Sequence, residues 1–151
     1  MKILQVVSYY YPHLGGIEQV ARDYAYAFCR AGVGNDEQRI FCFRHDKGGD
    51  TTEEIDGVRV TRSKSFAKVA SQSLSFTYGR NLKREINDFK PDLVVFHYPN
   101  PFAAHYLLKQ LKKHPEIRLL LVRHLDIFKQ KILKLFFSGQ TKRLLRRAVK
   151  V

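Results

Sequence analysis

Three short polar segments of the chain carry residue types and spacings that could bind or transfer a ligand. The first runs from Tyr9 through His13 to Gly15-Gly16, just before a predicted helix. Two adjacent glycines at a helix start leave backbone N–H groups free, and the helix dipole there favours an anion by about 0.3–1 kcal/mol. The pattern favours a phosphate seat, although a plain tight turn is the simpler explanation of a lone glycine pair. It is not the dinucleotide fingerprint, because the spacing G-x-G-x-x-G is absent after this segment.

The second segment surrounds a proline and combines an imidazole with an amide. His97 and Asn100 lie on either side of Tyr98-Pro99 and offer hydrogen-bond donors and acceptors that suit sugar hydroxyls. Asn100 could equally be the cap of a helix that Pro101 opens. A sugar- or hydroxyl-binding loop and a structural cap are both open at this point.

The third segment pairs His124 with Asp126, and Lys129 follows one turn into the next predicted helix. Histidine and aspartate two positions apart can orient each other or a shared ligand, while a carboxylate at this position is also a common helix cap. Most solitary pairs of this kind are structural. This one follows a predicted strand, as the other two segments do, and the shared position favours function.

Several other chemistries have no support in the sequence. The chain has no H-E-x-x-H pattern and no dense cluster of His, Cys and carboxylate residues, so a protein-held metal is not expected. A G-x-S-x-G elbow and a G-x-x-x-x-G-K-[ST] loop are also missing, which argues against a serine hydrolase and excludes a P-loop.

The polar segments lie between apolar runs and amphipathic stretches that alternate along the chain. Strands are predicted at 3–7, 38–43, 57–62, 92–96 and 117–122, a loop at 44–56, and helices at 17–31, from Ser71 or Ser73 to 89, from Pro101 onward and at 127–148 with a break near Ser138-Gly139. This alternation predicts one α/β domain: a Rossmann-like open, mostly parallel twisted sheet with helices on both faces. Ligands bind at the carboxyl ends of such strands, so the three segments should meet at one edge.

The apolar spacing also predicts the buried face of each helix. For helix 17–31 this face comprises Val20, Tyr24, Ala27, Phe28 and Ala31, and for the helix ending at 89 it comprises Leu74, Tyr78, Leu82, Ile86 and Phe89. The last residues, 149–151, have the character of a further strand, which suggests a piece of a longer protein.

The composition points to an anionic partner. Of 151 residues, 27 are Lys or Arg and 14 are Asp or Glu, which gives a net charge of +13. From residue 127 onward there are eight cations and no acid, beside an apolar stripe. Such a helix could lie on an anionic membrane at about 1 kcal/mol per cation. It could also simply pack on the sheet with its cations in water, and both can hold at once.

Cysteine usage and hydropathy indicate the compartment. Cys29 and Cys42 have no paired spacing, and no segment approaches 18 consecutive apolar residues. The sequence therefore predicts a cytoplasmic protein without a membrane span, which could act peripherally at the inner membrane face.

Five segments, at 1–6, 11–18, 55–60, 91–97 and 122–126, share their order and spacing with a known family over essentially the whole chain. They resemble the N-terminal, acceptor-side domain of the GT-B retaining glycosyltransferases of family 4. The resemblance implies two Rossmann-like domains that face each other across a cleft, the first binding the acceptor and the second the nucleotide sugar. Residues 1–151 would be the first domain, and the nucleotide-sugar-binding domain would be absent from this chain.

The resemblance also implies roles for individual residues. The backbone of Gly15 and Gly16 would approach the donor phosphates when the cleft closes. His124, near the reacting sugar, and Asp126 would be the catalytic residues, and the acceptor side would be lined by Tyr9, His13, His97, Asn100 and Lys129. No metal or other cofactor is expected beyond the nucleotide sugar as co-substrate. The sugar would keep its anomeric configuration, with the protein positioning groups and stabilising the departing phosphate.

The implied function is transfer of a hexose to a lipid-linked or polysaccharide acceptor. This chain alone would be inactive, because the family's pyrophosphate-gripping basic residues and its carboxylate motif lie in the second domain. Arg123 departs from the pattern, which leads us to expect a small uncharged residue there, and it could alter the acceptor pocket. The alternative is a non-catalytic basic module that binds anionic membrane or nucleic acid through residues 129–150. Nucleic acid is the less attractive partner, because the basic run lacks interleaved aromatic residues.

Overall fold

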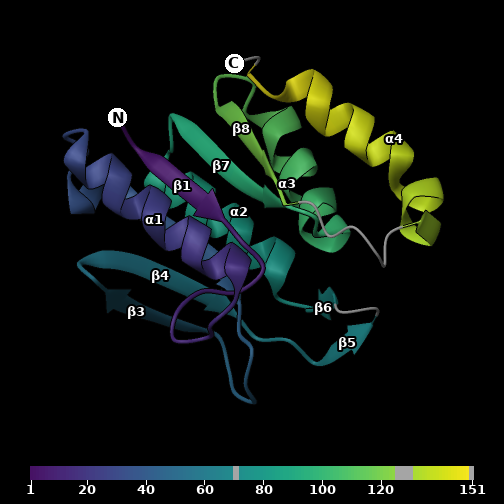
Figure 1. The fold of residues 1–151 in the computed structure, drawn as a ribbon, viewed down its shortest axis with the longest axis horizontal. Coiled ribbons are helices and arrows are strands. Elements are labelled where there is room, and N and C mark those ends of the chain that lie inside the picture. The colour runs from purple at the N-terminus through teal and green to yellow at the C-terminus, as the bar shows by residue number, and fades with distance from the viewer. Residues whose placement is uncertain (70–71, 125–130, 150–151) are drawn as a thin grey trace.

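The computed structural model describes residues 1–69, 72–124 and 131–149. Its main sheet has six strands in the order β3-β4-β2-β1-β7-β8. Five of them run parallel: β1 (Ile3–Val6), β2 (Gln38–Phe43), β4 (Val58–Ser63), β7 (Leu93–Tyr98) and β8 (Arg118–Arg123). The edge strand β3 (Thr51–Ile55) is antiparallel to β4. In Figure 1 the arrowheads of β1, β7 and β8 point the same way, so these strands end at a common edge.

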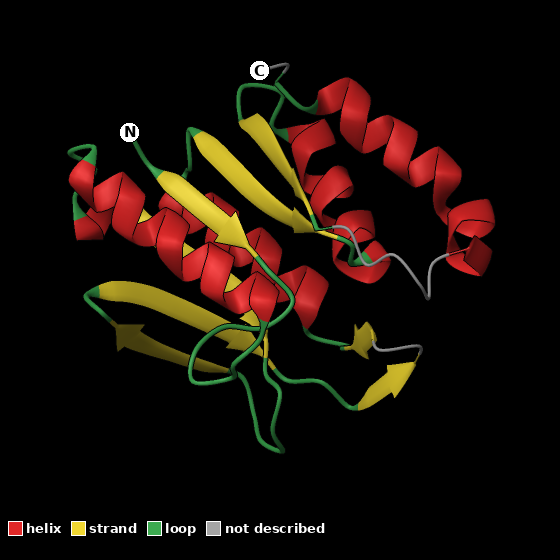
Figure 2. Cartoon of the chain, viewed as in Figure 1, coloured by secondary structure: helices red, strands yellow, loops and turns green. Residues whose placement is uncertain are grey.

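Helices cover both faces of this sheet (Figure 2). One face packs against α1 (Gly16–Arg30), whose Ala21 joins a small core with Ile40 and Val60. The other face carries the larger core, formed with α2 (Tyr78–Phe89), α3 (Pro101–Lys113) and α4 (Lys131–Arg147). The central strands are apolar on both sides, as parallel strands covered on both faces must be. The predicted Rossmann-like α/β fold is confirmed.

The helix α1 is rotated relative to its predicted orientation. Its buried apolar residues are Ala21 and Ala25, whereas Ala27 and Ala31 of the predicted face are exposed. Small side chains at the contact bring the helix backbone close to the sheet, so that Gln5 of β1 donates from Nε2 to the Ala21 carbonyl at 3.1 Å. The spacing could not reveal this, because the helix has alanines on more than one face.

The segment 44–56 is not simply the loop that the sequence predicts. It contains β3, which pairs with β4 through a tight turn at Asp56-Gly57. Both turn residues have positive φ, 51° and 77°, as the two-residue turn of a twisted hairpin requires. A second hairpin, β5 (Ala67–Val69) and β6 (Gln72–Leu74), was also missed. The sequence did not predict these short strands, because they lack the alternation of apolar and polar residues that marks a half-buried strand.

The start of α2 differs from its predicted position. The helix begins at Tyr78 rather than after Ser71 or Ser73, and Leu74 belongs to β6 instead. The hydroxyl oxygen of Ser75 accepts from the backbone N–H groups of Thr77 and Tyr78, which satisfies donors at this helix start. The remaining residues of the predicted face, Tyr78, Leu82, Ile86 and Phe89, are buried.

The C-terminal part of the chain departs from prediction at one point. α4 runs through Ser138-Gly139 without the predicted break, since a single glycine costs a helix only about 1 kcal/mol. Beyond it, the backbone N–H of Val149 donates to the Leu119 carbonyl of β8 at 2.8 Å, as the start of a further strand would. Residues 150–151 lie outside the described part. Among the described residues, no helix combines the length and apolarity that crossing a membrane requires.

Candidate functional site

In the described part of the chain, the polar segments meet at the carboxyl edge of the sheet, as predicted, with the third segment represented by His124. β1, β7 and β8 are parallel neighbours, so the residues that end or follow them emerge on the same side. His97 lies in β7 and His124 directly follows β8, and their Nδ1 and Nε2 atoms are 3.1 Å apart. Asn100 donates from Nδ2 to Ser8 Oγ, just after β1, at 3.1 Å.

A buried series of polar side chains leads from α1 along the adjacent face of the sheet to His124. Gln5 is 1% exposed and His97 is 0% exposed. The Oε1 atom of Gln5 lies 3.0 Å from His97 Nε2, and the Gln5 amide is held on its other side by the Ala21 carbonyl. Tyr24 of α1 packs edge-on against the His97 ring, with centroids 5.6 Å apart. The polar atoms of this chain are paired with one another, as burial requires.

Both imidazoles are neutral at physiological pH. Burial and, to a smaller extent, the neighbouring His124 together lower the pKa of His97 to about 3. Burial also lowers the pKa of His124, while the Glu18 carboxylate opposes that shift. Because each pKa lies below its usual value near 6.5, the uncharged forms dominate at pH 7. The pair can therefore exchange hydrogen bonds with a ligand but does not present a fixed positive charge.

Glu18 occupies the helix end that the sequence predicts as a phosphate seat. Its carboxylate is almost fully buried, and its Oε1 lies 3.2 Å from His13 Nδ1, close enough for an ion pair but without aligned hydrogen-bond geometry. A Cβ atom on Gly15 would lie 2.3 Å from Glu18 Oε2, whereas one on Gly16 would meet nothing within 4 Å. Gly15 thus makes room for Glu18. Phosphate binding by these glycines stays a prediction, and it requires this carboxylate to be displaced or neutralised.

The loop between β1 and α1 is fastened to neighbouring elements. Tyr9 Oη lies 2.5 Å from Ser73 Oγ of β6, and its ring centroid is 4.8 Å from that of His13. Lys68 of β5 places its ammonium 4.8 Å from the Tyr9 ring. The buried Arg62 of β4 donates to the backbone carbonyls of Tyr10, at 3.3 Å, and Tyr11. The loop is therefore held in place from two sides.

Asn100 has the capping role that was one of its two interpretations. Its Oδ1 accepts from the Ala103 N–H at 3.0 Å, at the start of α3, and the side chain is 2% exposed. With both side-chain ends paired, neither Asn100 nor the buried His97 offers a ligand a free surface in this structure. The acceptor-binding roles of Tyr9, His13, His97 and Asn100 stay predictions. Asp126 and Lys129 lie outside the described residues, and Arg123 is exposed at the end of β8.

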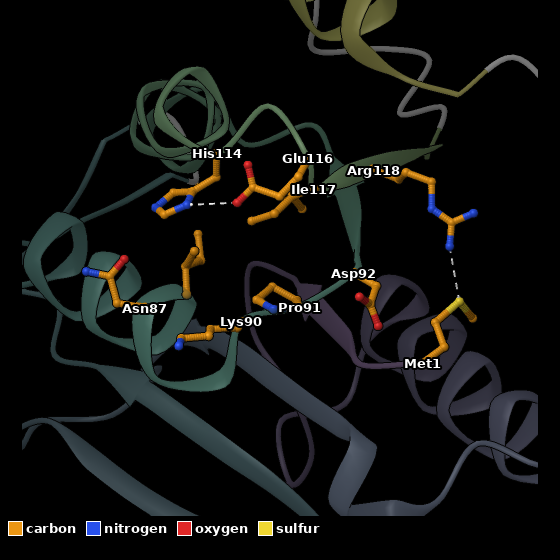
Figure 3. A pocket seen from close by; sticks show the side chains of 10 residues that line it. Met1, Asn87, Lys90, Pro91, Asp92, His114, Glu116, Ile117 and Arg118 are labelled. Carbon is orange, nitrogen blue, oxygen red and sulfur yellow. Dashed lines mark hydrogen bonds and ion pairs between the residues drawn. The ribbon is translucent and has the colours of Figure 1, made fainter.

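A cavity of about 840 Å³ lies at the opposite edge of the sheet (Figure 3). It is lined by residues near the amino ends of β1, β7 and β8, including Met1, Lys90, Asp92, His114 and Arg118. Several of its polar groups already have partners: His114 Nδ1 lies 3.2 Å from Glu116 Oε1, and Asp92 accepts from the backbone N–H of Lys2 at 2.8 Å. None of the predicted site residues lines this cavity.

Within residues 1–69, 72–124 and 131–149, no group of three or more His, Cys, Asp and Glu residues is placed to hold a metal ion. The expectation of a reaction without a metal stays a prediction.

Sequence reasoning assigned no role to three residues that shape this site: Gln5, Glu18 and Arg62. Gln5 interrupts an apolar strand, Ile-Leu-Gln-Val. Because a buried polar side chain needs a hydrogen-bond partner, this interruption could have predicted a structural role for Gln5. Glu18 occupies the first turn of α1, where a carboxylate suits the dipole. Arg62 carried no such signal, because its partners, the Glu53 carboxylate and the backbone carbonyls of Tyr10 and Tyr11, could not be read from its place in the sequence.

The lowered pKa of His97 predicts a pH dependence of stability. In the unfolded chain this imidazole takes up a proton below about pH 6.5, whereas in the folded chain it stays neutral down to about pH 3. The stability it contributes is therefore present above pH 6.5 and lost as the pH falls, by about 1.4 kcal/mol per pH unit. Between pH 7.5 and 4.5, wild type should lose about 2.7 kcal/mol more unfolding free energy than His97→Gln, measured by urea titration.

His105, exposed on α3, provides the matched control. His105→Gln should keep the wild-type pH dependence. Equal losses in wild type and His97→Gln would show that His97 is protonated in the folded chain.

Two comparisons with known proteins identify the family of this chain. The family model Glycosyltransferase Family 4 matches residues 14–151. The chain is 31% identical over 146 residues to the O-antigen chain mannosyltransferase C of Escherichia coli. That alignment covers 96% of this chain and 37% of the relative, so the chain spans little more than a third of the relative's length. Because the family model matches most of the chain and the relative is 31% identical over nearly all of it, the chain belongs to glycosyltransferase family 4.

Proposed function

We propose that this chain is the acceptor-side half of a retaining glycosyltransferase. In this proposal the enzyme moves a hexose from a nucleotide sugar to a lipid-linked or polysaccharide acceptor. A second, nucleotide-binding domain completes the cleft, and the chain alone does not turn over. Mannose is the favoured hexose, because the Escherichia coli relative is named a mannosyltransferase. The same name refers to an O-antigen chain, which is consistent with a polysaccharide acceptor.

One observation carries the proposal: His124, His13 and Glu18 gather at the carboxyl edge of the sheet, where open α/β folds bind ligands. They come from segments more than 100 positions apart in sequence, yet they share one small region. The neutral imidazole of His124 can exchange hydrogen bonds with sugar hydroxyls, and such contacts position a reacting group rather than attack it.

The donor phosphates belong at the start of α1 in this proposal. Gly16 leaves open space there, and the free N–H groups of the first helical turn favour an anion. The Glu18 carboxylate now lies in that region, beside His13. Movement of Glu18 on donor binding removes the charge conflict. The acceptor hydroxyl then attacks the anomeric carbon on the face from which the phosphate departs, so configuration is kept.

The test compares the chain alone with the whole protein that carries it and its second domain. Transfer is followed with radiolabelled nucleotide sugars and a panel of lipid-linked and polysaccharide acceptors. We expect turnover by the whole protein only. His124→Ala should reduce that turnover by at least about 100-fold while the protein still folds, because the loss falls on a group that contacts the reacting sugar.

His105→Ala, on the exposed surface of α3, is the matched control and should keep wild-type turnover. Robust transfer by residues 1–151 alone would refute the half-site proposal. Full activity of His124→Ala would refute the assigned position of the reacting sugar.

A peripheral contact with an anionic membrane at the cytoplasmic face is a second proposal, which can hold together with the first. On α4, the cations Lys142, Arg143 and Arg146 are exposed, and so is the nearby Leu145, at 47%. Arg147 differs from them, because its guanidinium donates to the carbonyls of Pro115 and Ile117. Exposed cations beside an exposed leucine are the pattern of a helix that rests on an anionic lipid surface.

Replacing Lys142, Arg143 and Arg146 together by serine tests this surface. With about 1 kcal/mol lost per cation, sedimentation with vesicles that contain phosphatidylglycerol should weaken by about 100-fold. The triple replacement of Lys109, Lys112 and Lys113, exposed on α3, removes the same charge and should have a smaller effect. Equal effects of the two triple variants would mean that only net charge matters and that α4 is no specific contact.

A further inference from the structure

The series of buried hydrogen bonds that ends at His124 also determines which side-chain atoms along it carry a hydrogen. It begins at the Ala21 carbonyl of α1, which can only accept. The atom of the Gln5 amide that faces this carbonyl, at 3.1 Å, must therefore be Nε2, since only Nε2 can donate. The Oε1 atom consequently faces the other way, toward the His97 ring, and it too can only accept.

This polarity passes through His97. Its Nε2 lies 3.0 Å from Gln5 Oε1 and must carry a hydrogen in order to donate. The ring is completely buried and uncharged, so it carries one hydrogen only, and its Nδ1 must be the accepting nitrogen. Gln5 therefore selects one of the two tautomers of His97.

The same reasoning determines the last residue. His124 Nε2 lies 3.1 Å from the accepting Nδ1 of His97, and the two rings are inclined by only 17°. The backbone N–H of His124 is held separately by the Tyr98 carbonyl at 2.9 Å. His124 must therefore donate from Nε2. In the neutral ring, Nδ1 is then the nitrogen with a free lone pair.

We propose that Gln5 and His97 are positioning residues that hold His124 in the tautomer protonated on Nε2 and leave Nδ1 as the acceptor for a substrate group that donates a hydrogen bond. The catalytic consequence rests on the proposed function, whereas the tautomer itself does not. Among the described residues, the Glu18 carboxylate of α1 acts electrostatically on this ring, and His97 of β7 lies within hydrogen-bond distance of it. A hydroxyl matches the lone pair of Nδ1, and a phosphate oxygen, which only accepts, does not.

The experiment reads the tautomer directly. Long-range ¹H–¹⁵N correlation spectra of the ¹⁵N-histidine-labelled chain distinguish a ring protonated on Nε2 from one protonated on Nδ1. We expect wild-type His124 to be in the Nε2–H form at pH 7.5. His97→Leu removes the acceptor and should give a mixture of both forms.

A conservative variant separates positioning from packing. In His97→Gln, the new amide can donate to Gln5 and accept from His124, so the Nε2–H form should persist. Gln110→Leu is the matched control, because Gln110 is a buried glutamine on α3 outside this chain of hydrogen bonds, and it should leave His124 unchanged. If His97→Leu does not fold, Gln5→Leu, which breaks the chain one step earlier, gives the same comparison.

Activity of the whole protein supplies the second readout. His97→Leu should lower kcat by about 10- to 100-fold with a smaller change in KM, the usual scale for removing a group that orients a functional histidine. His97→Gln should recover most of this loss. An unchanged Nε2–H form of His124 in both leucine variants would overturn the positioning proposal. Full activity of His124→Ala would instead overturn the proposed function, so the two failures are distinguishable.

Discussion

The site depends on one constraint: polar side chains buried between α1 and the sheet must satisfy each other. Gln5 and His97 are held on neighbouring strands, in a buried layer where every donor needs an acceptor. The close approach of α1 at Ala21 supplies the first acceptor, and the parallel register of β7 and β8 brings His124 to the last donor position. A change in helix orientation or strand order would leave at least one of these groups buried without a partner.

This constraint also links stability to function. Removing the chain of hydrogen bonds would make the core more apolar, and an apolar core is often at least as stable as a polar one. What the chain supplies is orientation: it fixes which nitrogen of His124 faces outward. Glu18 and His13 add an electrostatic element beside it, because the carboxylate stands where the α1 dipole would otherwise attract a phosphate. The proposed anion binding at this edge therefore requires the Glu18 carboxylate to move.

The sequence was sufficient to predict the layered sheet, because the central strands are continuous apolar runs and the helices between them carry clear periodic patterns. The meeting of the three polar segments followed from topology alone, since parallel strands end at one edge. The polar strands β3 and β5–β6 escaped prediction, because pairing through backbone groups leaves no apolar signature. The predicted buried face of α1 was wrong, because Ala21 and Ala25 pack against the sheet as well as the larger residues that the pattern favoured. The burial of His97 and Asn100 could not be read from residue types that serve equally as ligand contacts and as structural partners.

The central claim is that ligands bind at the carboxyl edge of the sheet, rather than in the cavity at its amino edge. Backbone amide shifts of the ¹⁵N-labelled chain during titration with an oligosaccharide acceptor test it most directly. The account predicts the largest changes at Tyr9, His13, Gly16 and His124. Changes confined to Lys90, His114 and Arg118 around the opposite cavity would contradict it.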